Sequence, residues 1–120
     1  NEIATAVRQK LPLIEVIVNN HVLGMVRQWQ DLFYEKRYSA TVLDDGVDYV
    51  KLAEAMGATG YRATTREAFN EALKAALAAK TPVVIDCVIG CDDKVWPMVA
   101  PGEAISSSFT GEDLAKKQQS

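Results

Sequence analysis

The sequence has little of what nucleic-acid binding requires. Its 13 Lys and Arg are outnumbered by 16 Asp and Glu, and the formal net charge is -3. Nucleic acids and acidic membranes are bound by clustered positive charge, and the adjacent Lys116 and Lys117 are too few to supply it. We therefore expect neither as a partner.

Long apolar segments are also missing. No apolar run approaches the roughly 20 residues that cross a bilayer. The first residues lack the basic region and the apolar core of a signal peptide. These absences lead us to expect a cytoplasmic protein that does not act at a membrane.

Cysteine and histidine are scarce. Cys87, Cys91 and the single His21 are the only residues of these two types. Two thiolates and one distant imidazole cannot fill a tetrahedral zinc site. Because disulfides are rare in the cytosol, we expect two reduced thiols.

The chain does contain enough apolar residues for one core. With 120 residues, 48% of them hydrophobic, it has the size of one domain or of part of one. Apolar residues at helical spacing open the sequence: Ile3, Val7 and Leu11. Pro12 is expected to end this helix. Residues 13–18, an apolar β-branched run, then predict a buried strand.

Three further helices are expected. One apolar face consists of Met25, Trp29, Leu32 and Phe33, and the opposite side of Arg27, Gln28, Gln30 and Asp31. Asp48 is expected to cap a second helix, which Gly57 stops. Thr64 and Glu67 have the spacing of a capping box at the start of a third.

Two more strands are expected at residues 59–63 and 83–89. The second is nearly all apolar, as is typical of a strand covered on both faces of a parallel sheet. Residues after Val95 are predicted to be largely irregular, with at most a helical turn at 111–117.

The alternation of strands and helices favours an α/β fold. Strands joined by helices lie parallel, with helices on both faces of the sheet. Three strands form only a partial parallel sheet. We assign this partial domain to residues 1–102 and a tail to residues 103–120.

The loop of residues 19–24 is the first place to look for a ligand, since parallel sheets bind ligands beyond the carboxyl ends of their strands. Asparagine side chains and backbone carbonyls are hard ligands that suit magnesium. Gly24, before a helix, lets backbone N–H groups approach a phosphate. The alternative is that Asn19 and Asn20 only end the strand by bonding to their own backbone.

Three longer segments make the case more specific: NEIATAVRQKLPLIEVIVNNHVLGMVRQWQDLFYEKRYS, DYVKLAEAMGATGYRATTREAFNEALKAAL, and PVVIDCVI followed by VWPMVAPG. Together they resemble the C-terminal part of the thiamine diphosphate (ThDP)-binding domain of acetolactate (acetohydroxyacid) synthase large subunits. The resemblance covers about nine tenths of the chain.

The resemblance implies a site for the cofactor. Asn20 would bind Mg²⁺ through its side chain, and Val22 through its backbone carbonyl. The backbone of Leu23, Gly24 and Met25 would face the diphosphate. In the family, an aspartate ligand belongs to a glycine-aspartate-glycine triplet, which we expect just upstream of this sequence.

The resemblance also implies a substrate channel, formed in part by Met25, Val26, Trp29 and Phe33. A stripe of Met and aromatic residues at helical spacing is otherwise typical of a core.

Titratable residues near the loop have structural explanations. His21 is next to the expected metal ligand, and we interpret it as a loop residue. Asp86, in an apolar strand, is expected to be a hydrogen-bonded structural carboxylate. Glu2 and Glu15 have no reason to be catalytic, so we assign no catalytic residue to this chain.

The reaction implied for the parent enzyme is decarboxylation of pyruvate and carboligation to a second 2-keto acid. The resemblance implies ThDP and Mg²⁺ as cofactors, with FAD bound mainly outside this chain. The activating glutamate would come from another domain of a neighbouring subunit. The implied partners are the remaining domains, a second copy of the subunit and, in some members, a regulatory subunit. We expect this part alone to be inactive.

Two alternatives remain open at the level of sequence. The chain could be a non-catalytic α/β fragment or interaction module, or part of another ThDP carboligase such as a glyoxylate carboligase or a pyruvate oxidase. A biosynthetic and a catabolic role are equally compatible with the residues.

Overall fold

The structure, a computed structural model, describes residues 2–43 and 46–117. The chain splits into two compact units. The first comprises Asn1–His21 and Leu43–Cys91, and the second comprises Val22–Val42 and Asp92–Ser120. The assignment of residues 1–102 to the partial domain and of 103–120 to a tail stays a prediction.

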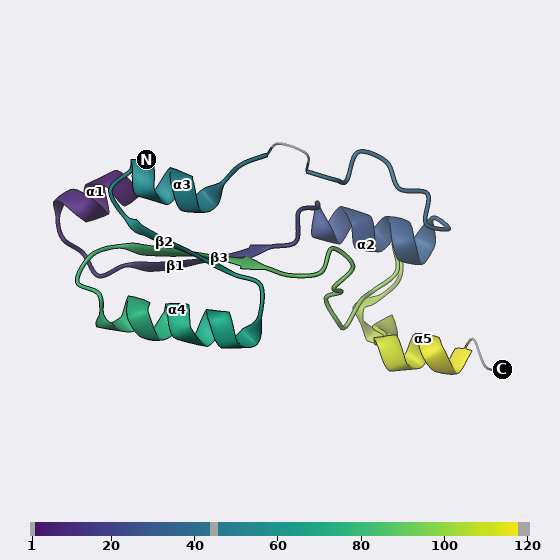
Figure 1. Cartoon of the computed structure of the whole chain (residues 1–120). Coiled ribbons are helices and arrows are strands. Elements are labelled where there is room, and N and C mark those ends of the chain that lie inside the picture. Colours follow the sequence, from purple (N-terminus) through teal and green to yellow (C-terminus); the bar gives the residue numbers. More distant parts are fainter. Residues whose placement is uncertain (1, 44–45, 118–120) are drawn as a thin grey trace. The chain divides into compact units, whose positions relative to one another are not determined.

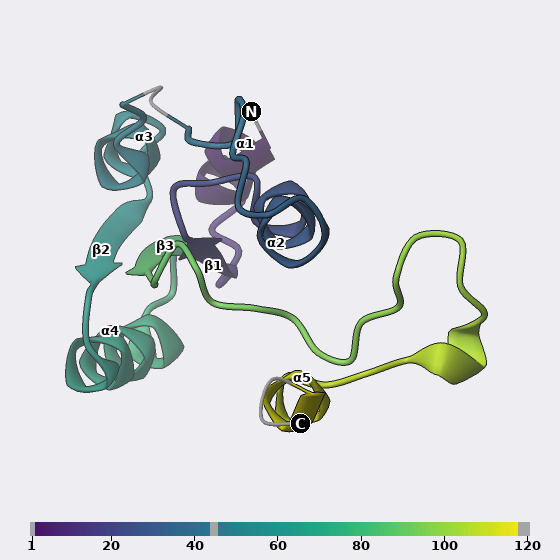
Figure 2. The ribbon, with the colours of Figure 1, turned by 90° about the vertical axis from the view of Figure 1, so that its right-hand side faces the viewer.

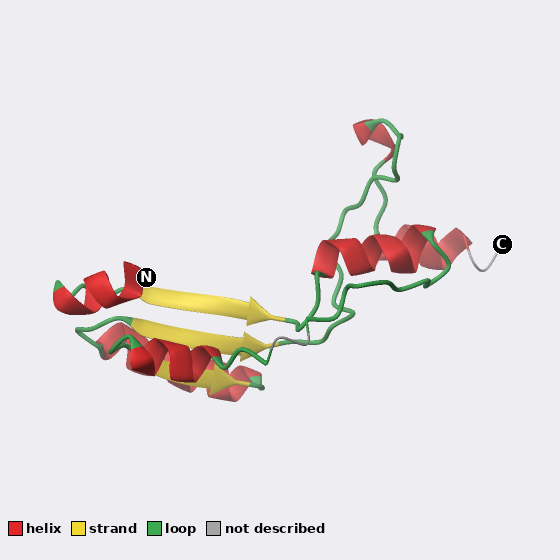
Figure 3. Ribbon diagram, turned by 90° about the horizontal axis from the view of Figure 1, so that it is seen from above, coloured by secondary structure: helices red, strands yellow, loops and turns green. Residues whose placement is uncertain are grey.

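The first unit is built on a three-stranded sheet of β1 (Ile14–Asn19), β2 (Thr59–Ala63) and β3 (Val83–Val88). The strand order is β1-β3-β2, and both pairs are parallel. Figure 3 shows the three arrows running in the same direction. The predicted partial parallel sheet is therefore confirmed.

Helices cover both faces of this sheet. Helices α1 (Glu2–Arg8) and α3 (Tyr49–Ala55) lie on one face, and α4 (Arg66–Ala78) lies on the other (Figures 1 and 2). Successive side chains of a strand point to opposite faces. Val83 and Ile85 accordingly pack with Ala72 and Ala76 of α4, whereas Val84 packs on the α3 face.

Strand β1 differs from the prediction, because it is not buried. It lies at an edge of the described sheet, and Val16 and Val18 are 39% and 66% exposed. Helix α4 packs against β2 and β3. The α4 face of β1 is therefore left largely open, although its sequence is as apolar as that of a buried strand.

The end of α1 also differs from the prediction. The helix ends at Arg8, before Pro12 is reached. Leu11 N donates to Ala6 O over 3.0 Å, and Lys10 N donates to Val7 O over 3.0 Å. This is a Schellman arrangement, with Lys10 in the left-handed conformation at φ 54°. Leu11 leaves the helical face and is exposed.

The predicted ends of α3 are confirmed, whereas the predicted start of α4 is not. Asp48 accepts from Lys51 N over 3.2 Å at the start of α3, and Gly57 follows its end at φ 87°. Both predictions are confirmed. At α4 the cap is Thr65, which accepts from Ala68 N over 3.1 Å. The predicted box of Thr64 and Glu67 is therefore wrong by one residue.

The second unit contains α2 (Gly24–Phe33), the 3-10 turn η1 (Ile105–Ser107) and α5 (Gly111–Lys117). The segment after Val95 is largely irregular, as predicted, but α5 has seven residues where at most a helical turn was expected, and η1 was not predicted. Isolated antiparallel bridges join Val22 to Val42 and Met98 to Phe109. Across the described part of the chain, no helix is both long and apolar enough to span a membrane.

Close packing of α3 on β2 predicts the effect of a single added methyl group. A Cβ at Gly60 would lie 2.8 Å from Val50 Cγ1 and 2.9 Å from the Val50 carbonyl oxygen. We expect Gly60→Ala to lower the free energy of unfolding by about 1–3 kcal/mol, because α3 must move away. Urea denaturation measures this.

Gly46→Ala is the matched control for Gly60→Ala. Gly46 has φ 62°, and an added Cβ would meet no described atom within 4 Å. It therefore reports backbone strain alone, at about 1–2 kcal/mol. A negligible loss for Gly60→Ala would contradict the packing argument.

Candidate functional site

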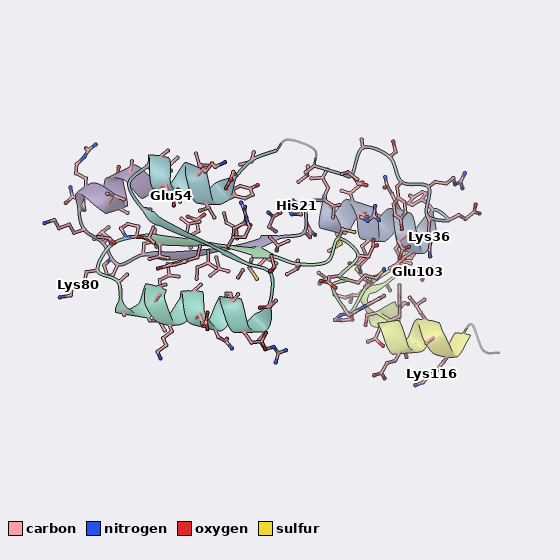
Figure 4. The ribbon with its side chains drawn as sticks, viewed as in Figure 1. His21, Lys36, Glu54, Lys80, Glu103 and Lys116 are labelled. Atoms are coloured by element: carbon pink, nitrogen blue, oxygen red, sulfur yellow. The ribbon has the colours of Figure 1, made fainter. Side chains whose placement is uncertain are left out.

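The carboxyl end of β1 carries the Asn pair singled out in the sequence. Asn19 Oδ1 accepts from His21 N over 3.1 Å, and Asn19 Nδ2 donates to Asp86 Oδ1 over 3.0 Å. The structural reading is therefore confirmed for Asn19. Asn20, half-buried, directly follows the strand at the place predicted for it. His21 is exposed, with φ 56°, at the end of β1 (Figure 4).

Asp86 is the hydrogen-bonded structural carboxylate that the sequence predicted. It is 2% exposed on β3. Besides the Asn19 amide, it accepts from Arg62 Nε over 3.0 Å. The contact with Asp86, followed by that with Asp48, raises the pKa of Arg62 above its ordinary value. The Lys51 N–H, with help from Arg62, holds the pKa of Asp48 below its ordinary value.

The donor set near the loop suits a hard cation only in part. Within the described ranges, no three His, Cys, Asp or Glu side chains converge to hold a metal. The loop offers the Asn20 amide oxygen and the Val22 backbone carbonyl, which are oxygen donors of the kind that Mg²⁺ prefers. These donors fit Mg²⁺ chemically, but the negative charge that it requires must come from the diphosphate and from outside this chain. Asn20 belongs to the first unit and Val22 to the second.

The start of α2 suits a diphosphate. Its N-cap is Leu23, whose aliphatic side chain cannot accept from the N–H groups of the first turn. The Leu23 N–H itself donates to the Thr41 carbonyl over 2.8 Å. Helix N-termini of this kind bind phosphate oxygens through their backbone N–H groups. The predicted cofactor residues Leu23, Gly24 and Met25 form this turn.

Helix α2 buries its polar side and exposes its apolar side. Gln28 is 4% exposed, and its amide both donates to Val95 O over 2.8 Å and accepts from Val95 N over 2.9 Å. By contrast, Met25 and Val26 are 49% and 50% exposed, and Trp29 is 36% exposed. The core reading is therefore wrong for Met25, Val26 and Trp29 in the described chain, where these side chains are open to a ligand or partner, whereas Phe33 is half-buried.

Ion pairs hold the polar side of α2 to the segment after β3. Arg27 Nε contacts Asp92 Oδ1 at 2.7 Å, and Lys94 Nζ contacts Asp31 Oδ2 at 2.7 Å. Tyr38 donates to Asp31 Oδ1 over 3.0 Å, and the Arg27 guanidinium lies 4.0 Å from the Tyr38 ring centroid. The hydrogen bond from Lys94 lowers the pKa of Asp31, although burial opposes the shift. These contacts fix the helix on the side away from its apolar residues.

A groove of about 640 Å³ lies over the exposed side of α2. Its lining combines three predicted channel residues with three that the sequence reading missed: Met25, Val26 and Trp29 with Gln30, Tyr34 and Arg37. The spacing of four that links Val26, Gln30 and Tyr34 was a signal that could have found two of these. Arg37 follows the helix, so no periodicity pointed to it.

Phe33 lies outside this groove. It lines a second cavity, of about 370 Å³, together with Phe109. Its ring is in edge contact with Trp29 at a centroid distance of 6.0 Å and with Phe109 at 6.2 Å. The structure thus brings Met25, Val26 and Trp29 together and places Phe33 behind Trp29.

Comparison with known sequences gives the family of the chain. Residues 1–87 match the family described as thiamine pyrophosphate enzyme, C-terminal TPP binding domain. The chain belongs to this family. It is 47% identical over 106 residues to an acetolactate synthase of Mycobacterium avium, which covers 84% of this chain and 17% of that protein. It is 41% identical over 105 residues to the acetolactate synthase isozyme 2 large subunit of Escherichia coli (strain K12), which covers 88% of this chain and 19% of that protein.

Solved structures of thiamine pyrophosphate enzymes share the fold. A thiamine diphosphate-dependent 4-hydroxybenzoylformate decarboxylase of Rhodococcus jostii superposes with a TM-score of 0.65 at 31% identity, over 73% of this chain and 16% of that one. A benzoylformate decarboxylase from Polynucleobacter necessarius gives 0.68 at 29% identity, over 78% and 18%. This chain therefore spans less than a fifth of the length of these relatives.

The buried amide of Gln28 predicts a measurable loss of stability. Gln28→Leu replaces the amide by a slightly shorter aliphatic side chain and leaves the N–H and C=O of Val95 without their present partner. We expect the free energy of unfolding to fall by about 1–3 kcal/mol, because two part-buried hydrogen bonds are lost. Thermal and urea denaturation measure this.

Gln30→Leu is the matched control for Gln28→Leu. The Gln30 amide also bonds in both directions to one residue, Ser39, but at an exposed site. Water replaces those bonds, so we expect a smaller loss. Equal losses at the two positions would contradict the assignment of the buried side of α2.

Proposed function

We propose that this chain is part of a ThDP-dependent acetolactate synthase, which decarboxylates pyruvate and joins the product to a second 2-keto acid. The observation that carries the proposal is the sequence identity with acetolactate synthases, 40–47% over more than four fifths of the chain. Membership of the TPP-binding family supports it independently. The reaction is a transfer of a two-carbon unit, and FAD belongs to the proposal as a cofactor held mainly outside this chain.

The chain's share of the chemistry is to hold and orient the cofactor. ThDP supplies an electron sink when bound. Asn20 and Val22 would provide two oxygen ligands to Mg²⁺, and the first turn of α2, from Leu23 through Gly24 to Met25, would provide N–H groups to the diphosphate. No residue of this chain is assigned to proton transfer.

The groove over α2 fits a short 2-keto acid. Met25, Val26 and Trp29 offer an apolar wall for its alkyl group, and Arg37 offers a cation for its carboxylate. The Arg37 side chain makes two exposed contacts, an ion pair with Glu35 at 3.6 Å and a hydrogen bond from Nε to the Tyr34 carbonyl over 3.3 Å. We therefore propose this groove as one wall of the substrate channel, with Phe33 supporting Trp29 from behind.

The exposed apolar residues of α2 indicate that other parts of the whole protein bind to this helix. Met25, Val26 and Trp29 are 49%, 50% and 36% exposed on α2, and neighbouring exposed apolar side chains are typical of an interaction site. We propose that other domains of the whole protein and a second copy of its subunit complete the site, and that a regulatory subunit binds elsewhere. A cytoplasmic location and a role in branched-chain amino acid biosynthesis are part of the same proposal. The isolated chain would be inactive, because it supplies too few of the Mg²⁺ ligands.

A second candidate function is a 2-keto acid decarboxylase, since the two solved structures are named as benzoylformate-type decarboxylases. Their identity to this chain, 31% and 29%, is lower than that of the acetolactate synthases. Product analysis with pyruvate separates the two activities. Acetolactate supports the synthase, and free aldehyde with no carboligation product supports the decarboxylase.

The proposed ligand Asn20 predicts a loss of cofactor binding. In the full-length protein, we expect Asn20→Ala to weaken the apparent affinity for Mg²⁺ at saturating ThDP at least tenfold, because one coordinating oxygen is lost. Calorimetric titration measures this, and the isolated chain should show no saturable heat. Asn70→Ala on the exposed side of α4 is the control. Full affinity in Asn20→Ala would rule out this residue as a ligand.

The groove predicts a separation of selectivity from stability at Trp29. Trp29→Leu should change the preference for the second 2-keto acid severalfold and cost little stability, because the ring is partly exposed. A loss of about 3–5 kcal/mol with unchanged kinetics would instead indicate a core aromatic residue. Competition assays and denaturation of the full-length protein measure both.

Trp96→Leu is the control for Trp29→Leu. Trp96 is half-buried, and its ring lies 6.0 Å from that of Phe109, outside the residues that line the groove. We expect this substitution to lower stability and to leave substrate preference unchanged.

A further inference from the structure

A row of four polar side chains crosses the whole sheet of the first unit on its α3 face. Asp48 Oδ1 accepts from Arg62 Nη2 over 2.8 Å, and Arg62 Nε donates to Asp86 Oδ2 over 3.0 Å. Asp86 Oδ1 accepts from Asn19 Nδ2 over 3.0 Å. The row therefore links the start of α3 to β2, β3 and the carboxyl end of β1.

The row is buried at Asp86 and Asn19, whereas the Arg62 side chain is 45% exposed. Asp86 is 2% exposed and Asn19 is 9% exposed, next to the apolar cluster that contains Val84. A carboxylate there is stable only if its oxygens are paired, and here each oxygen has a donor. Because apolar residues would serve packing at least as well, the row is better explained by the geometry that it imposes.

The Asn19 amide connects this row of side chains to the loop that follows β1. The Asp86 carboxylate only accepts hydrogen bonds, so Asn19 must turn its Nδ2 towards β3. Its Oδ1 then faces the other way and accepts from His21 N over 3.1 Å. This bond closes a turn around Asn20 and holds His21 at φ 56°, a conformation that non-glycine residues seldom adopt.

We propose that Asp86 is a positioning residue for Asn20, acting through Asn19 and the His21 N–H and held in place by Arg62. Asp86 does not touch the metal or the cofactor in this scheme. It fixes the turn in which Asn20 presents its amide oxygen. The proposal rests on the proposed function, in which Asn20 binds Mg²⁺ for ThDP.

The test uses the full-length protein and two readouts. The first is hydrogen exchange of the His21 amide without cofactor, and the second is the Mg²⁺ affinity at saturating ThDP. In Asp86→Asn, an amide N–H must face the donor of either Asn19 or Arg62. We expect the His21 amide to lose protection and the Mg²⁺ affinity to fall about 10- to 100-fold, as is usual when support behind a ligand is removed.

An exchange of the two side chains provides the rescue. In the double variant Asn19→Asp and Asp86→Asn, the amide stands on β3 and the carboxylate on β1. The amide can donate to that carboxylate and accept from Arg62, and the carboxylate can still accept from His21 N. We expect the double variant to recover most of the His21 amide protection and of the Mg²⁺ affinity that Asp86→Asn loses.

Thr65→Ala controls for a general loss of stability. It removes the α4 cap, so the Ala68 amide should exchange faster while the His21 amide and the Mg²⁺ affinity stay at the wild-type values. If Asp86→Asn does not fold, Asn19→Ala replaces it. That variant keeps the pair of Asp86 and Arg62 and removes the Asn19 amide with both of its bonds, to Asp86 Oδ1 and to His21 N, so we expect the same losses.

The outcomes separate this inference from the proposed function. If the wild type binds no ThDP with Mg²⁺, the proposed function is wrong. If the wild type binds and either single variant keeps both His21 protection and Mg²⁺ affinity, the positioning role is wrong. A loss of protection with unchanged affinity also overturns it, because the turn would then not govern Asn20.

Discussion

The structure of the first unit depends on a strand that is buried on both faces and yet carries a carboxylate. Strand β3 supplies Val83 and Ile85 to one layer and Val84 to the other, so both helical layers are held through it. Asp86 continues the same strand at 2% exposure. Its position is stable only with Asn19 on one neighbouring strand and Arg62 on the other. Packing and polar pairing therefore fix the same register of three strands.

Helix α2 of the second unit differs from a usual amphipathic helix, because its polar side is the buried one. Helix α2 turns Gln28 inwards, where its amide satisfies both backbone groups of Val95. Met25, Val26 and Trp29 are thereby directed to a groove instead of a core. The ion pair of Asp31 with Lys94 holds the same side. A helix fixed by its polar side can present Met25 and Trp29 to a ligand without losing its own support.

Local signals in the sequence were sufficient where a neighbouring residue decides the structure. Asp48 and Gly57 bound α3 as expected, because a side-chain cap and a left-handed glycine act within one turn. The same kind of reasoning missed at α1, where Lys10 takes the left-handed conformation without being glycine, and at α4, where two adjacent threonines compete for one cap. The parallel sheet itself was predictable from the alternation of elements.

Contacts between distant parts of the chain were not predictable from local patterns. Strand β1 has the composition of a central strand, and Val16 and Val18 are exposed because α4 packs on β2 and β3. The partner of Gln28 lies 67 residues later, so nothing near it indicated that it is buried. The Asn19 amide was open to two interpretations, and the position of Asp86 decides between them. Arg37 carried no periodic signal at all.

The strand order has a consequence for the time course of folding. In the described sheet, β1 pairs only with β3, and the hydrogen-bond partner of Asn19, Asp86, lies 67 residues further along the chain. Pairing over such a separation closes a long loop before any contact compensates for the lost entropy, and it is slow compared with helix formation. At a ribosome that adds about 5–20 residues per second, β1 emerges several seconds before β3 exists. During that interval, none of the other strands of the described sheet can pair with β1.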